Sequence, residues 1–247
     1  MAVIYYVFVM LLCGMYSTAV GIKFPLNMLD KKHYTDCQQL KKAGYNESGM
    51  YYLWKNSTTP YKVHCDMKDI KAEAVPILIL QRAFGNETFN RGWHDYVIGF
   101  GQIHADYWAG LNRIYYLTST GYNVLTVHMQ DWNGNSFSLR YNHFKLMNSL
   151  DYTLSVSGCS QPSYDDLSYG NGAGFTTPDK DKTYCAGRQQ SGWWFQPQWC
   201  AFALPTGQYY QGGHYTPTTM MYNGVYWSHW RGYDYSLRFI SFILSTI

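Results

Sequence analysis

The most constraining feature of this sequence is a run of aromatic residues and glycines near its C-terminal end. The run extends from Cys185 to Tyr235 and includes the tripeptide Gly-Trp-Trp between Cys185 and Cys200. Aliphatic residues are scarce, and glycines interrupt the run repeatedly, which excludes a regular amphipathic helix. Aromatic side chains at this density are typical of a loop-built region whose rings form the walls of a shallow pocket.

The N-terminal residues predict export from the cell. Residues 3–12 form a nearly continuous apolar run, no charged side chain precedes Lys23, and small residues suited to cleavage end at Ala19. We predict a signal peptide over residues 1–19 and a short N-terminal segment over residues 20–35. An uncleaved membrane anchor is the alternative, but the tyrosines and hydroxyl residues of this segment make a poor spanning helix. No membrane insertion is expected after cleavage.

Three Asn-X-Ser/Thr tripeptides agree with an extracellular protein. They begin at Asn46, Asn56 and Asn86, and we predict glycosylation at all three. Each lies before residue 90, so the attached glycans would leave the aromatic C-terminal region uncovered.

Composition and motifs argue against several functional classes. About 225 residues remain after cleavage, enough for one large domain or two small ones. The net charge is only +3, and the sequence contains no run of basic residues, so no nucleic-acid partner is indicated. The sequence lacks the G-x-S-x-G, H-E-x-x-H and phosphate-loop motifs, and its eight histidines are scattered without ligand spacing. We therefore predict that the protein is not an enzyme.

Two segments of the middle region have a clear hydrophobic period. One face of a helix is predicted by the apolar residues Phe89, Trp93, Tyr96, Val97 and Phe100. Residues 123–129 and 137–141 instead alternate with a period of two, on either side of the turn sequence D-W-N-G-N at residues 131–135. That arrangement predicts a β-hairpin.

The motifs of the C-terminal region resemble, in their order, those of fibrinogen-related domains. They are G-W-W at 192–194, a cysteine at 200, N-G-x-x-W at 223–227 and W-x-G-Y-x-Y-S at 230–236. Asp36-Cys37 and Gln81-Arg82 resemble motifs of the opening of such a domain, so the resemblance covers residues 36–247. It implies a fibrinogen C-terminal-like globular domain of the α+β class, with a central antiparallel sheet, short helices and a loop-rich C-terminal subdomain.

Five cysteines remain after signal cleavage, because Cys13 lies in the signal peptide. An oxidising compartment favours disulfides, although the sequence alone permits several pairings. The resemblance implies the pairs Cys37–Cys65 and Cys185–Cys200.

Cys159 is left over in this pairing scheme. The resemblance favours a buried free thiol, since related domains usually have a bulky apolar residue at this position. The alternative is an intermolecular disulfide, and we therefore keep an oligomer formed through Cys159 as a prediction.

Fibrinogen-related domains commonly bind calcium in a loop that corresponds to Asp179 and Asp181. Calcium takes about six to eight oxygen ligands. Here Thr183 stands where the third carboxylate is expected, the loop is shorter, and two lysines adjacent to Asp181 repel a cation. We expect a solvated turn and predict no cofactor. Weak calcium binding through Asp179 and Asp181 is the alternative.

The resemblance also implies a ligand pocket beside the second cysteine of the C-terminal pair. In lectin-like members a histidine follows this cysteine, and histidine and tyrosine rings surround an acetyl group. Here Ala201 follows Cys200, and Met221 replaces a tyrosine, so we expect a larger, less polar pocket for a bulkier or more apolar ligand. The predicted ligand-binding residues are Trp199, Cys200, Ala201, His214, Met221, Tyr222 and Tyr226.

Other aromatic residues of this region are expected to differ in role. Tyr209 and Tyr233 are expected to add to the aromatic surface that is available to a ligand. The resemblance implies core positions for Trp193, Trp194, Trp227 and Trp230.

Two functional classes are consistent with these features. The first is a secreted, lectin-like module of innate immunity that recognises glycans or acylated groups. The alternative is an extracellular protein-interaction or signalling domain whose partner is a cell-surface protein.

Overall fold

A computed structural model describes residue 27 and residues 32–54, 60–67, 76–217 and 221–246 of the chain. The predicted signal peptide and Asn56 lie outside these residues. Seven strands form the main path of an antiparallel sheet in the order β1-β2-β3-β11-β6-β7-β8. The strands are β1 (Gly49–Trp54), β2 (Pro60–Cys65), β3 (Ile77–Arg82), β6 (Val124–Gln130), β7 (Ser136–Leu146), β8 (Leu154–Cys159) and β11 (Phe239–Ser245). With its short helices, this sheet confirms the predicted α+β class.

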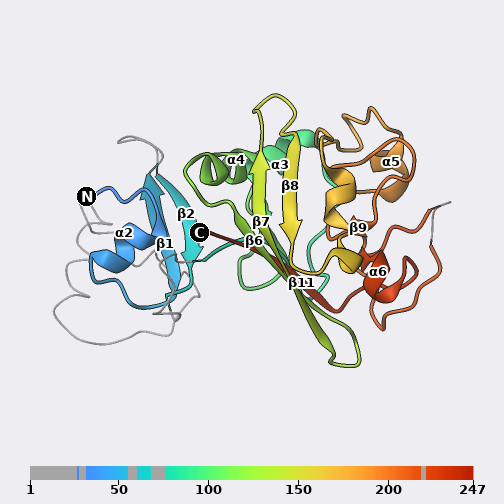
Figure 1. Cartoon of the computed structure of the whole chain (residues 1–247), viewed down its shortest axis with the longest axis horizontal. Coiled ribbons are helices and arrows are strands. Elements are labelled where there is room, and N and C mark those ends of the chain that lie inside the picture. The colour runs from blue at the N-terminus through green and yellow to red at the C-terminus, as the bar shows by residue number, and fades with distance from the viewer. Residues whose placement is uncertain (1–26, 28–31, 55–59, 68–75, 218–220, 247) are drawn as a thin grey trace, which may run out of the picture.

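The N-terminal part of the domain is helix α2 (Cys37–Lys42) followed by the β1–β2 pair, at the left of Figure 1. Asp36 begins the helix, because its Oδ1 accepts a hydrogen bond from Gln39 N at 2.8 Å. Cys37 and Leu40 form the buried face of α2, and the disulfide Cys37–Cys65 joins this helix to β2. The predicted pairing of these two cysteines is confirmed.

The predicted hairpin is formed by β6 and β7, which pair from Leu125↔Tyr141 to Gln130↔Ser136. Asp131 shapes its turn, since Oδ1 accepts hydrogen bonds from Asn133 N at 2.9 Å and Asn135 N at 2.8 Å. This carboxylate also binds Arg231 of the C-terminal region. The turn is therefore local in sequence but anchored by a distant residue.

The helix predicted over residues 89–100 is shorter in the structure. Only α3 (Trp93–Ile98) is helical, and Gly99, with φ +96, ends it. Phe89 lies outside the helix, with its ring 4.0 Å from the guanidinium carbon of Arg82. Burial of the predicted apolar residues is thus achieved by a loop, a short helix and a strand.

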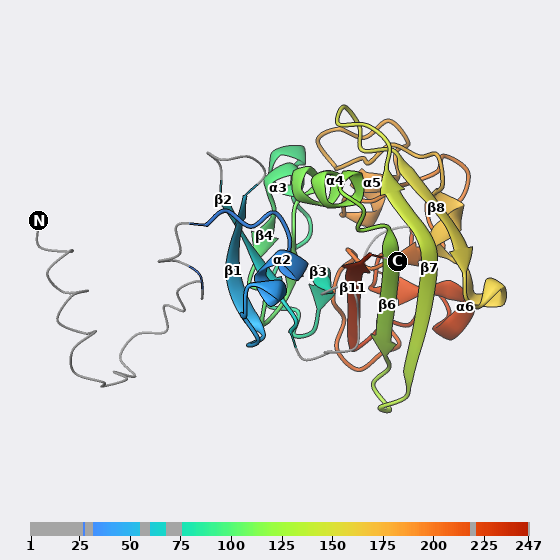
Figure 2. The same cartoon turned by 60° about the vertical axis from the view of Figure 1, so that its left-hand side comes forward.

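The core beside α3 is built from aromatic rings of distant segments. Helix α4 (Leu111–Ser119) lies next to α3 and packs against β7 (Figure 2). Phe175 contacts Trp108 and Trp194, with ring centroids 5.9 and 5.1 Å apart. The indoles of Trp108 and Trp194 donate to the carbonyls of Tyr96 and Tyr152, each at 2.8 Å. Their N–H groups are therefore paired despite burial.

A loop-rich subdomain lies between β8 and the return of the chain into β11, at the right of Figure 1. Its elements are the 3-10 helices η1 (Pro162–Tyr164) and η2 (Leu167–Gly170), the helices α5 (Cys185–Gln189) and α6 (Ser228–Arg231), and the strands β9 (Ala203–Leu204) and β10 (Tyr226–Trp227). The short strands β4 (Phe100–Gly101) and β5 (Tyr107–Trp108) pair with each other, and β5 also pairs with β3.

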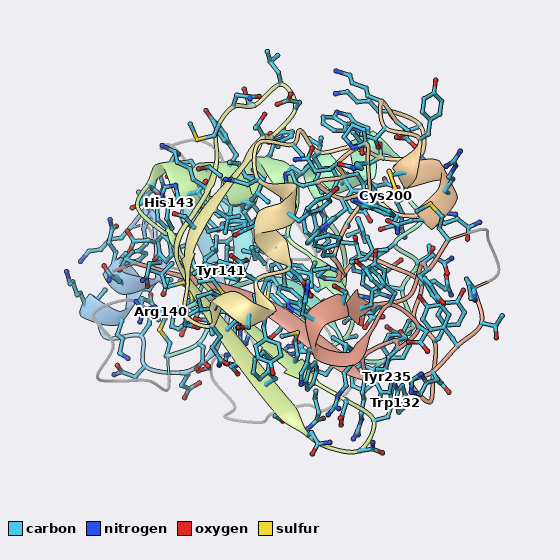
Figure 3. All side chains as sticks on the ribbon, turned by 45° about the vertical axis from the view of Figure 1, so that its right-hand side comes forward. Trp132, Arg140, Tyr141, His143, Cys200 and Tyr235 are labelled. Atoms are coloured by element: carbon cyan, nitrogen blue, oxygen red, sulfur yellow. A yellow bond between two sulfur atoms is a disulfide. The ribbon has the colours of Figure 1, made fainter. Side chains whose placement is uncertain are left out.

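Side-chain hydrogen bonds attach this subdomain to the sheet. Buried Arg82 donates from Nη1 to the carbonyls of Pro205 and Gly207, at 3.3 and 2.5 Å. Trp132, in the β6–β7 turn, donates from its backbone N to Tyr235 Oη at 2.9 Å, and Figure 3 shows these two residues together. The loops that carry the candidate site are consequently fixed relative to the sheet.

Candidate functional site: an aromatic groove near Cys200

An open groove of about 420 Å³ lies in the loop-rich subdomain, where it is lined by both neighbours of Cys200. Most of its surface is apolar, and none of its lining residues carries a charged side chain. Its lining residues are Gln189, Trp199, Ala201, Phe202, Met221, Tyr222, Tyr226 and Tyr233. The groove therefore joins the C-terminal end of α5, the segment after Cys200, β10 and the segment after α6.

The disulfide Cys185–Cys200 forms the base of one wall, as the resemblance implied. Gln196 and Cys200 exchange two backbone hydrogen bonds, of 2.9 and 3.0 Å, and thereby close a tight turn. Trp199 lies on this turn with 64% of its surface exposed, and its backbone N donates to Tyr169 Oη at 3.2 Å. A large indole is thus presented to solvent on an anchored backbone. Figure 3 marks the position of Cys200.

The floor of the groove is Tyr226, which is fully buried. Its hydroxyl donates to the carbonyl of Ala201 at 3.1 Å and accepts from Gln189 Nε2 at 3.0 Å. Burial raises the pKa of this hydroxyl, so it stays protonated at neutral pH. Its role in the structure is that of a neutral crosslink between α5 and the segment after Cys200.

Gln189 holds the opposite wall in place. Its Nε2 also donates to the carbonyl of Tyr222 at 3.0 Å, which fixes the orientation of the amide because a carbonyl only accepts. The buried Oε1 has no hydrogen-bond partner among the described residues. The side chain thus connects the rim residue Tyr222 to the floor residue Tyr226.

The rim of the groove is a set of contacting rings. Tyr222 is 44% exposed and stacks on Tyr233, with centroids 6.1 Å apart and planes at 26°. Phe202 stacks on Tyr169 at 4.2 Å. These contacts keep the exposed rings in defined orientations, which lowers the entropy lost when a ligand binds.

The structure brings together most of the predicted ligand-binding residues. Trp199, Ala201, Met221, Tyr222 and Tyr226 line the groove. Cys200 is not a lining residue, but its disulfide and backbone position Trp199 and Ala201.

Predicted binding residue His214 does not line the groove. Its ring is exposed, and Nδ1 lies 3.1 Å from Asp234 Oδ2. It also packs edge to face on Tyr235 at 5.0 Å. The carboxylate of Asp234 and the ring of Tyr235 therefore hold the histidine elsewhere, a contact that the spacing of the sequence did not indicate.

The predicted binding set omits three lining residues, Gln189, Phe202 and Tyr233, of which Tyr233 was expected only as part of the aromatic surface. Gln189 stands where some related domains have a tyrosine, and Phe202 follows Cys200 by two residues. Each carries a weak local signal, and their shared position depends on contacts between separate loops.

The four tryptophans expected in the core differ in burial. Trp193, Trp194 and Trp227 are buried, and Trp227 Nε1 donates to the Tyr164 carbonyl at 2.7 Å. Trp230 is partly buried and stacks on Phe137 with centroids 5.6 Å apart.

The predicted calcium ligands serve as acceptors for protein groups. Asp179 accepts from Trp93 N, at 2.9 and 3.1 Å, and from Thr177 Oγ1 at 2.6 Å. Asp181 Oδ1 accepts from Thr183 N at 2.9 Å, and its Oδ2 accepts from Gly187 N at 2.9 Å.

This arrangement does not fit a calcium site. Donor N–H and O–H groups are directed at the carboxylate oxygens that a cation would need. Within the described residues, no group of three histidine, cysteine, aspartate or glutamate side chains is arranged to hold a metal ion.

Other predicted sites lie away from the groove. Asn46 and Asn86 are exposed. Cys159 is a partly buried free thiol, its Sγ is 3.4 Å from the Gln161 carbonyl, and burial raises its pKa. A search of the described residues for a helix able to span a membrane finds none. Glycosylation of these asparagines and linkage through Cys159 remain predictions.

Proteins of known sequence are similar to this chain over most of its length. The family model described as the C-terminal globular domain of fibrinogen beta and gamma chains matches residues 33–246. Fibrinogen-like protein 1 of Rattus norvegicus is 36% identical over 228 residues, which cover 84% of this chain and 70% of the relative. Human angiopoietin-related protein 1 is 32% identical over 230 residues, and the match covers 90% of this chain but 45% of that protein.

Solved structures agree with the sequence matches. The fibrinogen-like globe domain of human ANGPTL2 has a TM-score of 0.77 and 34% identity, covering 85% of this chain and 98% of that chain. Lamprey fibrin D-dimer, complexed with the peptide ligand Gly-His-Arg-Pro-amide, has a TM-score of 0.77 and 26% identity, covering 99% of this chain and 82% of that chain. By sequence and by fold, the chain belongs to the fibrinogen beta and gamma C-terminal globular domain family.

Proposed function

We propose that this domain is a non-enzymatic extracellular recognition module that binds apolar side chains of a protein partner in the aromatic groove. The observation that carries the proposal is the exposure of Trp199 and Tyr222 on anchored loops around an uncharged hollow. Covering such rings removes apolar surface from water, which favours binding. The two disulfides support an oxidising, extracellular location.

The shortage of polar groups in the groove favours a protein side chain over a sugar. The amide Nε2 of Gln189 and the hydroxyl of Tyr226 are already engaged with each other and with backbone carbonyls, and the unpaired Oε1 of Gln189 adds one acceptor. A sugar presents many hydroxyl groups that need partners, whereas an apolar side chain needs only burial and a matching shape.

The fibrin relative supports peptide recognition, but the lining of this groove favours a peptide of different chemistry from the one that fibrin binds. Its ligand, Gly-His-Arg-Pro-amide, contains a basic side chain. The lining residues of this groove include no carboxylate that could pair with such a charge. We therefore propose a neutral, apolar or aromatic segment as the ligand.

A second candidate function is recognition of glycans or acylated groups, including those of microbes in innate immunity. It is favoured by the exposed indole of Trp199 and by the stacked pair Tyr222–Tyr233, because flat aromatic faces pack on the apolar face of a sugar ring.

Binding of the secreted protein to animal cells tests the proposal and separates the two candidates. Cells are treated with protease or with glycosidases before binding is measured, and a glycan array is run in parallel. Protease sensitivity with a negative array is the expected result. Loss of binding after glycosidase alone, with array signals that require Trp199, would replace the first candidate by the second.

Variants locate the binding site. Trp199→Ala and Tyr222→Ala should each lower affinity by about 5- to 150-fold, the range for a buried aromatic contact. Tyr184→Ala is the matched control, because Tyr184 is 77% exposed beside Cys185 but does not line the groove. Folded Trp199 and Tyr222 variants with unchanged affinity would show that the ligand binds elsewhere.

A further inference from the structure

A rigid loop after β3 carries the Asn-Glu-Thr tripeptide that begins at Asn86. The buried carboxylate of Asp106 holds its first residues, since Oδ1 accepts Ala83 N at 2.6 Å and Phe84 N at 3.0 Å. The hydroxyl of Tyr209 donates to the Arg238 carbonyl at 2.7 Å and lies 3.2 Å from the Ala83 carbonyl. The backbone on this side of Asn86 is therefore fixed by two distant side chains.

Arg91 fixes the other side of the same loop. Its Nη2 donates to Glu87 Oε1 at 2.7 Å, and its Nε donates to the Thr88 carbonyl at 3.0 Å. Nη1 forms a further ion pair with Asp95, on α3, at 3.2 Å. Because both sides are tied down, a group attached to Asn86 meets a surface that is already ordered.

A polar hollow of about 180 Å³ opens beside Asn86. Gly85 lies at its edge with φ +69, where any larger side chain would collide with the ring of Tyr209. The ring of Tyr209 therefore packs directly on the loop backbone. The hollow lies between residues 82–90 and, from the aromatic C-terminal region, Gln190 and residues 207–209. A glycan on Asn86 would therefore cover part of that region, contrary to the expectation from the sequence.

Phe84 is an unusually exposed aromatic residue for an anchored loop, with 61% of its surface in solvent. It precedes Asn86 by two residues, so their Cα atoms are at most about 7 Å apart. A sugar linked to the Asn86 side chain is thus within reach of the ring. An aromatic face and the apolar face of a pyranose ring are complementary surfaces.

We propose that Asn86 carries an N-linked glycan whose first N-acetylglucosamine residue packs on this loop, with its apolar face on Phe84 and its acetamido group over the polar hollow. The glycan then stabilises the folded domain by covering apolar surface and by supplying partners for the polar lining. This proposal requires passage through the secretory pathway, but it does not depend on the groove or its ligand.

Stepwise removal of the glycan tests this packing. The protein is secreted from animal cells with high-mannose glycans, and mass spectrometry of the peptide containing Asn86 measures occupancy. One sample is trimmed by an endoglycosidase that leaves a single N-acetylglucosamine, and another is fully deglycosylated by a peptide N-glycosidase. Trimming should leave Tm unchanged, whereas complete removal should lower it by about 2–4 °C.

Two variants make the test specific. Phe84→Ala should lower Tm while the first sugar is present and have little effect once it is removed. Asn46→Gln is the matched control, because Asn46 is exposed but the residue two before it is Gly44; it should not change Tm. An unoccupied Asn86, or a Phe84→Ala effect that is equal with and without the sugar, would overturn the proposal.

Discussion

Removal of the disulfide Cys185–Cys200 should destabilise the domain and loosen the wall of the groove. The bond joins residues separated by 15 positions, and cross-linking a loop of this length lowers the entropy of the unfolded chain. The expected loss for the double variant Cys185→Ala/Cys200→Ala is about 3 kcal/mol of unfolding free energy. For a domain of this size, that loss corresponds to a fall in Tm of roughly 6–12 °C.

The matched control is Cys37→Ala/Cys65→Ala. This bond spans 28 positions, so its removal should lower the free energy of unfolding by about 3.6 kcal/mol. The two double variants should therefore lose similar stability in urea denaturation, while only the first affects the groove.

Hydrogen exchange distinguishes the two variants locally. The backbone N–H groups of Gln196 and Cys200 bond to each other's carbonyls across the turn that carries Trp199. Without the C-terminal disulfide these two amides should exchange faster than the global loss of stability explains, whereas the N-terminal control should leave them at the global rate. A loss below about 1 kcal/mol, or unchanged local protection, would refute the role that we assign to this bond.

Two further predictions concern Asp179 and Asp131. Asp179→Ala removes the acceptor of Trp93 N and Thr177 Oγ1 and should lower Tm by about 2–4 °C, while a calcium chelator should leave the Tm of the wild-type protein unchanged; a chelator-induced fall of many degrees would contradict this reading of the loop. Burial raises the pKa of Asp131, but hydrogen bonds from Asn135 and Asn133 and the charge of Arg231 outweigh it, so the pKa lies below its ordinary value. The stabilisation is therefore complete above the unfolded pKa of about 4 and is lost as the pH falls through the folded pKa. Urea denaturation at pH values from about 2 to 6 should show that the free energy of unfolding falls less steeply with acid for Asp131→Asn than for the wild-type protein. Equal slopes would rule out the proposed contribution.

The β6–β7 turn and the two disulfides could be predicted without knowledge of any tertiary contact. The turn at residues 131–135 followed from a short polar sequence with glycine between two alternating strands, and β6 and β7 confirm it. The disulfides followed from the resemblance of the cysteine-containing motifs to a family. These features depend on neighbouring residues or on a motif order that the sequence displays directly.

The start of α3 and the role of Asp179 were decided by tertiary contacts, whereas the end of α3 at Gly99 is a local glycine signal. The apolar period over residues 89–100 indicated one buried face, but Phe89 packs on Arg82 before the helix begins. Asp179, a candidate calcium ligand by its place in a loop, accepts a hydrogen bond from Trp93, 86 positions away in the chain. Periodicity reports which side chains are buried, not which distant group buries them.

Residue composition was enough to predict an aromatic, loop-built surface in the C-terminal region, and the family resemblance added the Cys185–Cys200 pair. Which residues line the groove depends on the tertiary structure, because the groove forms where four separate segments meet. Gln189 and Phe202 joined it through contacts across loops, whereas Asp234 and Tyr235 held His214 away from it. Residue type supplies the chemistry of such a site, but the assembly of its walls depends on long-range hydrogen bonds and ring packing that no spacing in the sequence encodes.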